Sequence, residues 1–210
     1  MSEHVILLHG LWMRGFTLAA LRHRLEAAGF SVELFDYASV LRGPEVGVER
    51  LVAAARENKT KTKKIHFVGH SLGGLVALQA LQRAPEITRG RVVCLGSPLR
   101  GSAVARSVAQ FPGGSLVIGK SLDVLTRGIE RWEGKQAVGA IAGRLPIGFG
   151  FAFGALTSPH DGTVSVAETE LPGLTDHCVV PATHTGLLFS QDAAEQTIAF
   201  LRSARFAPAA

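Results

Sequence analysis

The sequence predicts an α/β fold in which a mostly parallel central sheet is covered by helices on both faces. Short apolar runs, such as HVILL at residues 4–8 and VVCL at 92–95, have the length of buried strands. Segments with apolar residues at helical spacing alternate with these runs, which is typical of a parallel sheet. Of the 210 residues, 47% are hydrophobic and 19% charged, which suits one large buried core rather than a disordered chain.

The first half of the chain is expected to alternate strands and helices from its first apolar run. Gly29 ends the first helix because glycine readily adopts the left-handed conformation that closes a helix. Pro44 begins the second because proline suits a first helical turn, and Pro85 ends the third. The expected order is strand 4–8, helix 16–28, strand 32–37, helix 44–58, strand 65–68 and helix 72–84.

The second half continues the alternation and leaves little room for another domain. We therefore expect a single domain over residues 1–210, with a small cap at about 111–135. The apolar run at 137–156 is interrupted by Arg144 and Pro146, so it falls short of the roughly 20 residues of a membrane-spanning helix. The expected order is strand 92–95, helix 102–110, one or two helices within 121–132 above the site, strand 137–142, strand 178–180 and helix 191–202.

Charge and cysteine content limit the partners and the compartment. The net charge of +5 includes the Lys59–Lys64 cluster, which fits a solvated loop or a weak contact with an anionic membrane surface. No aromatic residues interleave with these lysines, so a nucleic-acid partner is not expected. No signal-peptide pattern precedes the first strand, so we expect a cytoplasmic protein and, by default, a monomer. Cys94 and Cys178 lie in apolar runs and are expected to be buried free thiols.

The sequence GHSLG at residues 69–73 is a G-x-S-x-G motif in surroundings that suit a nucleophilic serine. The β-rich run IHFV at 65–68 precedes it and a helical pattern follows. In such a strand–turn–helix elbow the turn is too sharp for flanking side chains, and the serine hydroxyl stands above the sheet. We therefore predict that Ser71 is the nucleophile and that the Leu72 amide donates to the developing oxyanion.

A second donor is expected from HGLW at residues 9–12, directly after the first strand. An oxyanion hole needs two donors, and the second usually comes from a loop beside the nucleophile. Glycine at position 10 lets this backbone approach closely. We predict that the Leu11 amide is this donor and that His9 organises the loop; the alternative is an ordinary strand-ending turn with a structural histidine.

A serine nucleophile also needs a base, which follows the acid in the chain for an elbow of this kind. His184 lies in PATHTG at residues 181–186, in a loop after the strand 178–180 and before the last helix. His177 is the rival, but it begins that strand and should lie at the opposite end of the sheet. We predict that His184 is the base.

The acid is predicted to be Asp161, in a loop after the strand 137–142. Asp176 is close to His184 in sequence but precedes its strand, so it should face the far end of the sheet. Asp123 falls in the expected cap. The alternative for Asp161 is a solvent-exposed turn, because Asp-Gly is a common turn pair.

Aromatic residues are the candidates for substrate contact. Residues 144–157 alternate Phe and Gly, which suits either an acyl pocket, through Phe149 and Phe151, or a packed core. Trp12 and Trp132 are candidates for the pocket rim, with core packing as the alternative. The sequence contains no metal-binding, P-loop or dinucleotide-binding pattern, so neither a metal nor a cofactor is expected.

Together, HGLW, GHSLGG, VVCLGSPLRGS, DGTVSV and THTGLL resemble the lipase-like branch of the α/β-hydrolase family, over residues 4 to about 200. That branch includes bacterial triacylglycerol lipases and deacylases that act on glycosylphosphatidylinositol. The resemblance implies an α/β-hydrolase fold and hydrolysis of small-molecule or lipid esters, with Ser71, Asp161 and His184 as the triad. The chain departs from this branch in having space for only a small cap, so a large interfacial lid is not expected.

Two other functions stay open at this point. Acyl transfer to an alcohol or amine would use the same triad in place of hydrolysis. A non-catalytic binding module on a hydrolase scaffold is a different class, and a serine-reactive probe distinguishes it.

Overall fold

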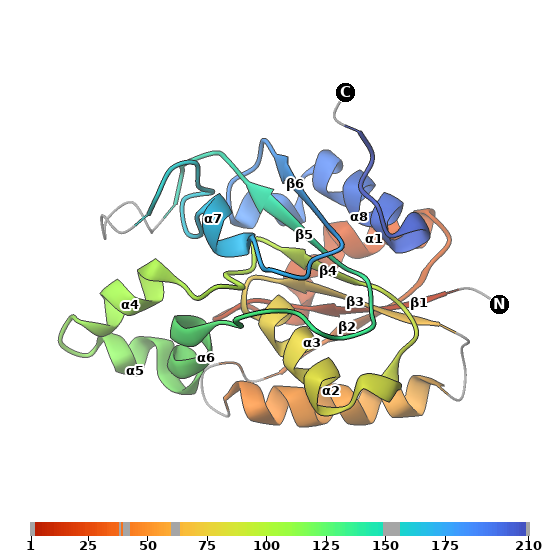
Figure 1. Ribbon diagram of the computed structural model, residues 1–210, viewed down its shortest axis with the longest axis horizontal. Coiled ribbons are helices and arrows are strands. Elements are labelled where there is room, and N and C mark those ends of the chain that lie inside the picture. Colours follow the sequence, from red (N-terminus) through yellow and green to blue (C-terminus); the bar gives the residue numbers. More distant parts are fainter. Residues whose placement is uncertain (1–2, 38, 40–42, 60–63, 149–155, 209–210) are drawn as a thin grey trace.

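The computed structural model, which describes residues 3–37, 39, 43–59, 64–148 and 156–208, has a six-stranded sheet at its centre (Figure 1). The strand order is β2-β1-β3-β4-β5-β6, and every neighbouring pair is parallel. The α/β fold predicted from the sequence is therefore confirmed. The strands are β1 (His4–Leu8), β2 (Ser31–Phe35), β3 (Ile65–His70), β4 (Val92–Leu95), β5 (Val138–Gly143) and β6 (Asp176–Val180).

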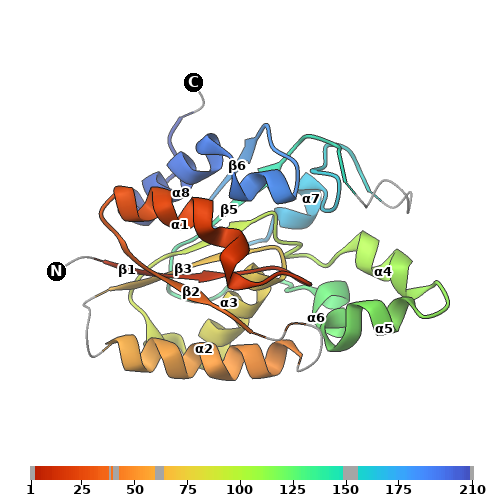
Figure 2. The ribbon, with the colours of Figure 1, turned by 180° about the vertical axis from the view of Figure 1, so that it is seen from behind.

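Helices cover both faces of the sheet because its strands are apolar on both sides. On β1, Ile6 and Leu8 belong to the buried cluster formed with α2 and α3, whereas Val5 and Leu7 belong to the cluster formed with α1 and α8. Successive side chains of a strand point to opposite faces, which accounts for this division. Figure 2 shows α1 and α8 together on one side, with α2 on the other. These helices are α1 (Ala19–Ala27), α2 (Pro44–Lys59), α3 (Leu72–Arg83) and α8 (Gln191–Ser203).

Three short helices form a group beyond the carboxyl ends of the strands (Figure 1). They are α4 (Ala103–Ala109), α5 (Gly114–Ile118) and α6 (Leu122–Arg127), and α4 packs against both of the others. We group α4 with the cap, which extends the expected region of 111–135 toward the N-terminus. The helix expected within 121–132 ends at Arg127, because Gly128 adopts a positive φ of 65°.

Several element boundaries differ from those expected. The strand expected at 65–68 continues to His70, and the strand expected at 178–180 already begins at Asp176, because pairing with β4 and β5 includes these residues. The helix expected at 16–28 divides into a 3-10 turn and α1. The helices α5 and α7 (Val166–Thr169) were not expected, since such short helices do not show a helical period in sequence.

The apolar run at 137–156 contributes β5, which is buried throughout. Within the part of the chain that the structure describes, no helix is long and apolar enough to cross a membrane. Cys94 and Cys178 are free, as expected. Cys94 is buried, but Cys178 is only partly so because β6 is an edge strand of the sheet. Most of the Lys59–Lys64 cluster lies outside the described residues, and Lys64 forms an ion pair of 2.9 Å with Glu3.

Candidate active site

Ser71 lies in a sharp turn between β3 and α3. Its φ of 53° and ψ of −121° are unusual for a residue with a side chain, and such strain persists only where the surroundings enforce it. A Cβ atom on Gly69 would lie 2.4 Å from the carbonyl carbon of Gly73. A Cβ atom on Gly73 would lie 2.6 Å from the carbonyl oxygen of Leu8. Both flanking positions of the motif therefore require glycine, and the serine stands at the carboxyl edge of the sheet.

The loop after β1 lies directly against this turn. A Cβ atom on Gly10 would come within 3.1 Å of Ser71 Cβ, so glycine allows the close approach expected from the sequence. Leu11 and Ser71 line the same pocket. Among the described residues, neither the Leu11 amide nor the Leu72 amide has a hydrogen-bond acceptor. The two amides predicted to bind an oxyanion are thus both available.

His184 and Asp161 form a close pair at the same edge of the sheet. His184 Nδ1 lies 2.7 Å from Asp161 Oδ2, and the His184 amide donates to the Asp161 carbonyl oxygen over 2.8 Å. Asp161 Oδ1 accepts from the amides of Thr163 and Val164 at 2.9 and 2.7 Å. With an exposed fraction of only 1%, Asp161 is not the solvent-exposed turn residue that was the alternative. Its hydrogen bonds fix the carboxylate, which in turn orients the imidazole.

His70 connects the turn of Ser71 to the loop of His184. Its Nε2 atom donates to the His184 carbonyl oxygen at 3.0 Å, and the two ring centroids are 4.7 Å apart. Burial, followed by the nearby His184 ring, lowers the pKa of His70 to about 3, so the ring is neutral near pH 7. Its Nδ1 atom is buried and has no hydrogen-bond partner in the structure's described part.

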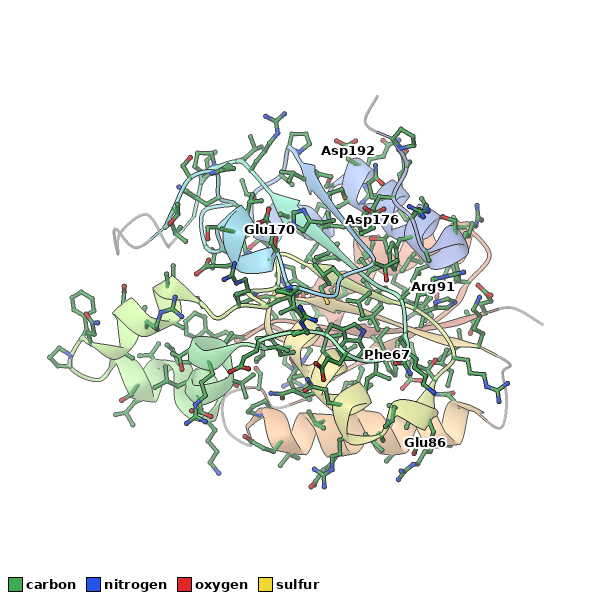
Figure 3. The ribbon with its side chains drawn as sticks, in the orientation of Figure 1. Phe67, Glu86, Arg91, Glu170, Asp176 and Asp192 are labelled. Atoms are coloured by element: carbon green, nitrogen blue, oxygen red, sulfur yellow. The ribbon has the colours of Figure 1, made fainter. Side chains whose placement is uncertain are left out.

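The rival acid and base residues lie elsewhere. His177 is hydrogen-bonded to Thr169 at 2.8 Å, and Asp123 forms an ion pair with Arg127 on α6. Figure 3 shows Asp176 at the end of the sheet that faces away from α4, where it accepts from the Phe206 amide. None of the three lines the pocket beside Ser71.

A pocket of about 310 Å³ opens beside Ser71 and His184. Its wall on the cap side comes from α4, α5 and α6, and its floor from the loops after β1 and β3. Most of its lining is apolar, which suits a hydrocarbon chain better than a charged group. The apolar side chains that line it are Leu11, Trp12, Met13, Pro98, Val104, Ala105, Val108, Ile118, Leu125 and Val164.

The aromatic candidates have different outcomes. Trp12 lines the pocket, is 62% exposed and donates from Nε1 to the carbonyl oxygen of Val117 on α5. Trp132 is buried in the core, so the rim interpretation is wrong for this residue. Phe149 and Phe151 lie outside the described residues.

Sequence reasoning did not identify His70 or the lining residues of α4. The helical spacing of Val104, Ala105 and Val108 was a usable signal, since these residues lie on one face of a helix. For His70 the signal was its place beside Ser71 in the motif, but its partner is distant in sequence.

Comparisons with known proteins agree with this fold. The model of the Alpha/beta hydrolase family matches residues 5–207. The mature lipase BlEst2 of Bacillus licheniformis has a similar structure, with a TM-score of 0.77, 17% identity, and coverage of 97% of this chain and 92% of that chain. Phospholipase PlaB of Legionella pneumophila gives a TM-score of 0.69 at 15% identity, covering 97% of this chain and 59% of that one. The metagenomic carboxyl esterase MGS0156 gives a TM-score of 0.66 at 20% identity, covering 87% of this chain and 64% of that chain. No curated protein matches the chain in sequence.

Proposed function

Because the chain belongs to the Alpha/beta hydrolase family, we propose that it is a serine hydrolase that cleaves carboxylic esters through an acyl-enzyme. Ser71 is the nucleophile of this proposal, His184 the base and Asp161 the acid. One observation carries it above the others: the strained Ser71 lines the same apolar pocket as His184, whose ring is hydrogen-bonded to the buried Asp161. Serine activation requires a base beside the hydroxyl and an acid that orients this base, and His184 and Asp161 are the candidates for these two roles.

In the proposed reaction, His184 Nε2 takes the proton of Ser71 while Ser71 Oγ attacks the ester carbonyl. Asp161 holds Nδ1–H and stabilises the imidazolium that forms. The negative oxygen of the tetrahedral intermediate accepts from the Leu11 and Leu72 amides. Collapse of this intermediate breaks the ester bond, and the proton passes from His184 to the leaving alcohol. A water molecule then gives a proton to His184 as it attacks the acyl-enzyme carbonyl. Collapse of the second tetrahedral intermediate breaks the bond between the acyl group and Ser71 Oγ, His184 returns the proton to Ser71, and the acid is released.

The proposed substrates are small-molecule or lipid esters with a short-to-medium acyl chain. The apolar lining supports an acyl chain, and the volume of about 310 Å³ favours a modest chain length. A lipase, an esterase and a phospholipase are among the similar structures, which supports an ester substrate by analogy of fold. We propose no nucleic-acid partner, no metal and no cofactor for this reaction.

The proposal is tested with a fluorophosphonate probe and a series of p-nitrophenyl esters from acetate to palmitate. The wild-type protein is expected to become labelled at Ser71 and to hydrolyse the shorter esters fastest. Ser71→Ala is expected to lose both the labelling and nearly all of the turnover. An unlabelled wild-type protein without esterase activity would instead favour the binding-module interpretation. A Ser71→Ala variant with most of the wild-type rate would assign the nucleophile to another residue.

A further inference from the structure

A His–carboxylate pair separate from that of His184 and Asp161 lies beside the loop that carries the Leu11 amide. His9 is completely buried at the carboxyl end of β1. Its Nδ1 atom lies 2.8 Å from the carbonyl oxygen of Gly10, and its Nε2 atom lies 2.9 Å from Asp36 Oδ1. Asp36 follows β2, the strand adjacent to β1, so the parallel pairing brings this carboxylate next to the ring.

The hydrogen-bond partners determine how the His9 ring is held. A carbonyl oxygen can only accept, so Nδ1 carries a hydrogen and donates to Gly10. Nε2 either donates to Asp36 or accepts from the Tyr37 amide, which is 3.2 Å away. The Tyr37 ring stacks on the imidazole with centroids 4.5 Å apart, and the Tyr37 hydroxyl donates to the His9 carbonyl oxygen at 2.8 Å. The hydrogen bonds at its nitrogens therefore hold the ring against rotation in its own plane, and the stacked Tyr37 ring holds it against tilting.

Asp36 is itself held in its ionised form. Partial burial alone would raise its pKa, but hydrogen bonds and charge interactions with Arg14 and His9 outweigh burial and lower it. Arg14 Nε donates to Asp36 Oδ2 at 2.8 Å, which leaves Oδ1 for His9. Arg14, Asp36 and His9 thus form a chain of contacts that ends on the Gly10 carbonyl oxygen.

The hydrogen bond from His9 to the Gly10 carbonyl oxygen also determines the direction of the Leu11 N–H. The Gly10 carbonyl and the Leu11 N–H belong to the same peptide group, which is planar and trans, so the two bonds point in opposite directions. The Met13 amide also approaches this carbonyl oxygen, at 3.4 Å. Fixing the carbonyl on the His9 side therefore fixes the Leu11 N–H on the other side, and Gly10 is in close contact with Ser71. A hydrogen bond to the carbonyl also polarises the peptide and strengthens its N–H as a donor.

We propose that His9, supported by Asp36 and Arg14, is a positioning residue that orients the Gly10–Leu11 peptide for oxyanion binding. This inference rests on the proposed function, because it concerns the donor of that oxyanion hole. His9 touches neither substrate nor nucleophile in this proposal. It acts only through the peptide, so its removal changes the stabilisation of the transition state and leaves ground-state binding of the ester intact.

Two substitutions separate the two nitrogens of the ring. In His9→Asn the amide nitrogen lies near the position of Nδ1 and can still donate to the Gly10 carbonyl oxygen. In His9→Gln the amide lies near the position of Nε2, so the contact with Asp36 can persist while the contact with Gly10 is lost. Glu26→Ala, which removes an exposed ion pair of 2.7 Å with Arg22 on α1, is the matched control for the loss of a charged contact.

The readouts are kcat and KM for p-nitrophenyl butyrate, and the affinity for an alkyl boronic acid that forms a tetrahedral adduct with the serine. His9→Gln is expected to lower kcat on the order of 10²-fold, to weaken boronic acid binding in parallel, and to change KM by less than about twofold. His9→Asn is expected to recover at least about tenfold of the kcat loss, as an intact Gly10 contact requires. Glu26→Ala is expected to retain the wild-type values.

Asp36→Ala keeps the inference testable if His9→Gln does not fold, which circular dichroism reveals. It leaves the His9 ring in place and is expected to lower kcat several-fold at constant KM. Wild-type kcat in the folded His9→Gln or Asp36→Ala protein would overturn the inference. Equal kcat losses in His9→Gln and His9→Asn would also overturn it, as would a rise in KM with kcat unchanged. A wild-type protein that neither hydrolyses esters nor reacts with fluorophosphonate would instead refute the proposed function itself.

Discussion

His70 Nε2 donates a hydrogen bond to the carbonyl oxygen of His184 over 3.0 Å, and the two rings lie 4.7 Å apart. The residue before the proposed nucleophile therefore supports the loop that carries the proposed base. The same ring has a buried Nδ1 atom without a partner in the described structure, which costs stability. The two nitrogens of His70 thus have opposite effects on the free energy of unfolding.

Substitution of His70 by Phe is expected to lower kcat while changing stability little. The lost hydrogen bond is worth about 1 kcal/mol, but the unsatisfied Nδ1 atom, whose burial costs about 1–3 kcal/mol, is removed as well. The His184 loop loses its support, and a misplaced base lowers kcat roughly tenfold to a hundredfold. Esterase kinetics and urea denaturation measure the two effects. His177→Phe, which removes a histidine far from the pocket, should leave kcat unchanged; a wild-type kcat in His70→Phe would contradict the prediction.

Asp161→Asn is expected to reduce kcat by about 10⁴-fold with a small change in KM. The amide no longer selects the tautomer of His184 that accepts the proton of the serine, although the group has the same shape. Steady-state kinetics with p-nitrophenyl butyrate provides the measurement. Asp192→Asn, on the exposed start of α8 (Figure 3), is the control and should behave as wild type. A loss below about tenfold in Asp161→Asn would remove Asp161 from the triad.

Features of the candidate site that depend on local sequence or on the order of the strands could be predicted from the sequence. The turn of Ser71 was predictable because its strain is local, and only glycine fits at positions 69 and 73. The pairing of Asp161 with His184 was also predictable, because both follow neighbouring parallel strands and so meet at one edge of the sheet. These residues lie where the sequence predicted; their catalytic roles are still a prediction.

Contacts that depend on packing could not be predicted in this way. A tryptophan suits a pocket rim and a core equally well by composition, and only the packing places Trp132 in the core and Trp12 at the pocket. The bond between His70 and His184 joins residues far apart in the chain, and no local pattern indicates it. The packing of α4 against α5 and α6 joins side chains from separate helices, and α5 is too short to show a helical period in sequence.

Stability is expected to fall on acidification below pH 6.5. Burial lowers the pKa of His66 to about 4 and that of His70 to about 3 in the folded protein, below the ordinary value of 6.5. As the pH falls below 6.5, these two histidines therefore bind protons in the unfolded chain but stay neutral in the folded chain. The stability that depends on the neutral rings is complete above pH 6.5. Below pH 6.5, each ring lowers the free energy of unfolding by up to about 1.4 kcal/mol per pH unit.

Urea denaturation between pH 4.5 and 7.5 measures this slope. The His66→Asn variant tests the assignment, because an amide oxygen can replace Nδ1 as the acceptor for the Arg91 amide but does not titrate. Its free energy of unfolding should depend on pH less steeply than that of the wild type. A slope equal to that of the wild type would mean that His66 does not contribute.

Filling the pocket from α4 is expected to shorten the acyl chain that the protein accepts. Val108 lines the pocket, and the larger side chain of Val108→Phe would occupy part of its volume of about 310 Å³. A short chain that stays near Ser71 avoids this group, whereas a longer chain must displace it or bend. The values of kcat/KM for octanoyl and longer esters should therefore fall by about tenfold or more, equivalent to about 1.4 kcal/mol, while those for acetate and butyrate change little. Leu116→Phe is the matched control, since Leu116 lies on α5 but is exposed and does not line the pocket. If the two variants gave the same chain-length profile, the acyl chain would have to bind outside the space between α4 and the turn of Ser71.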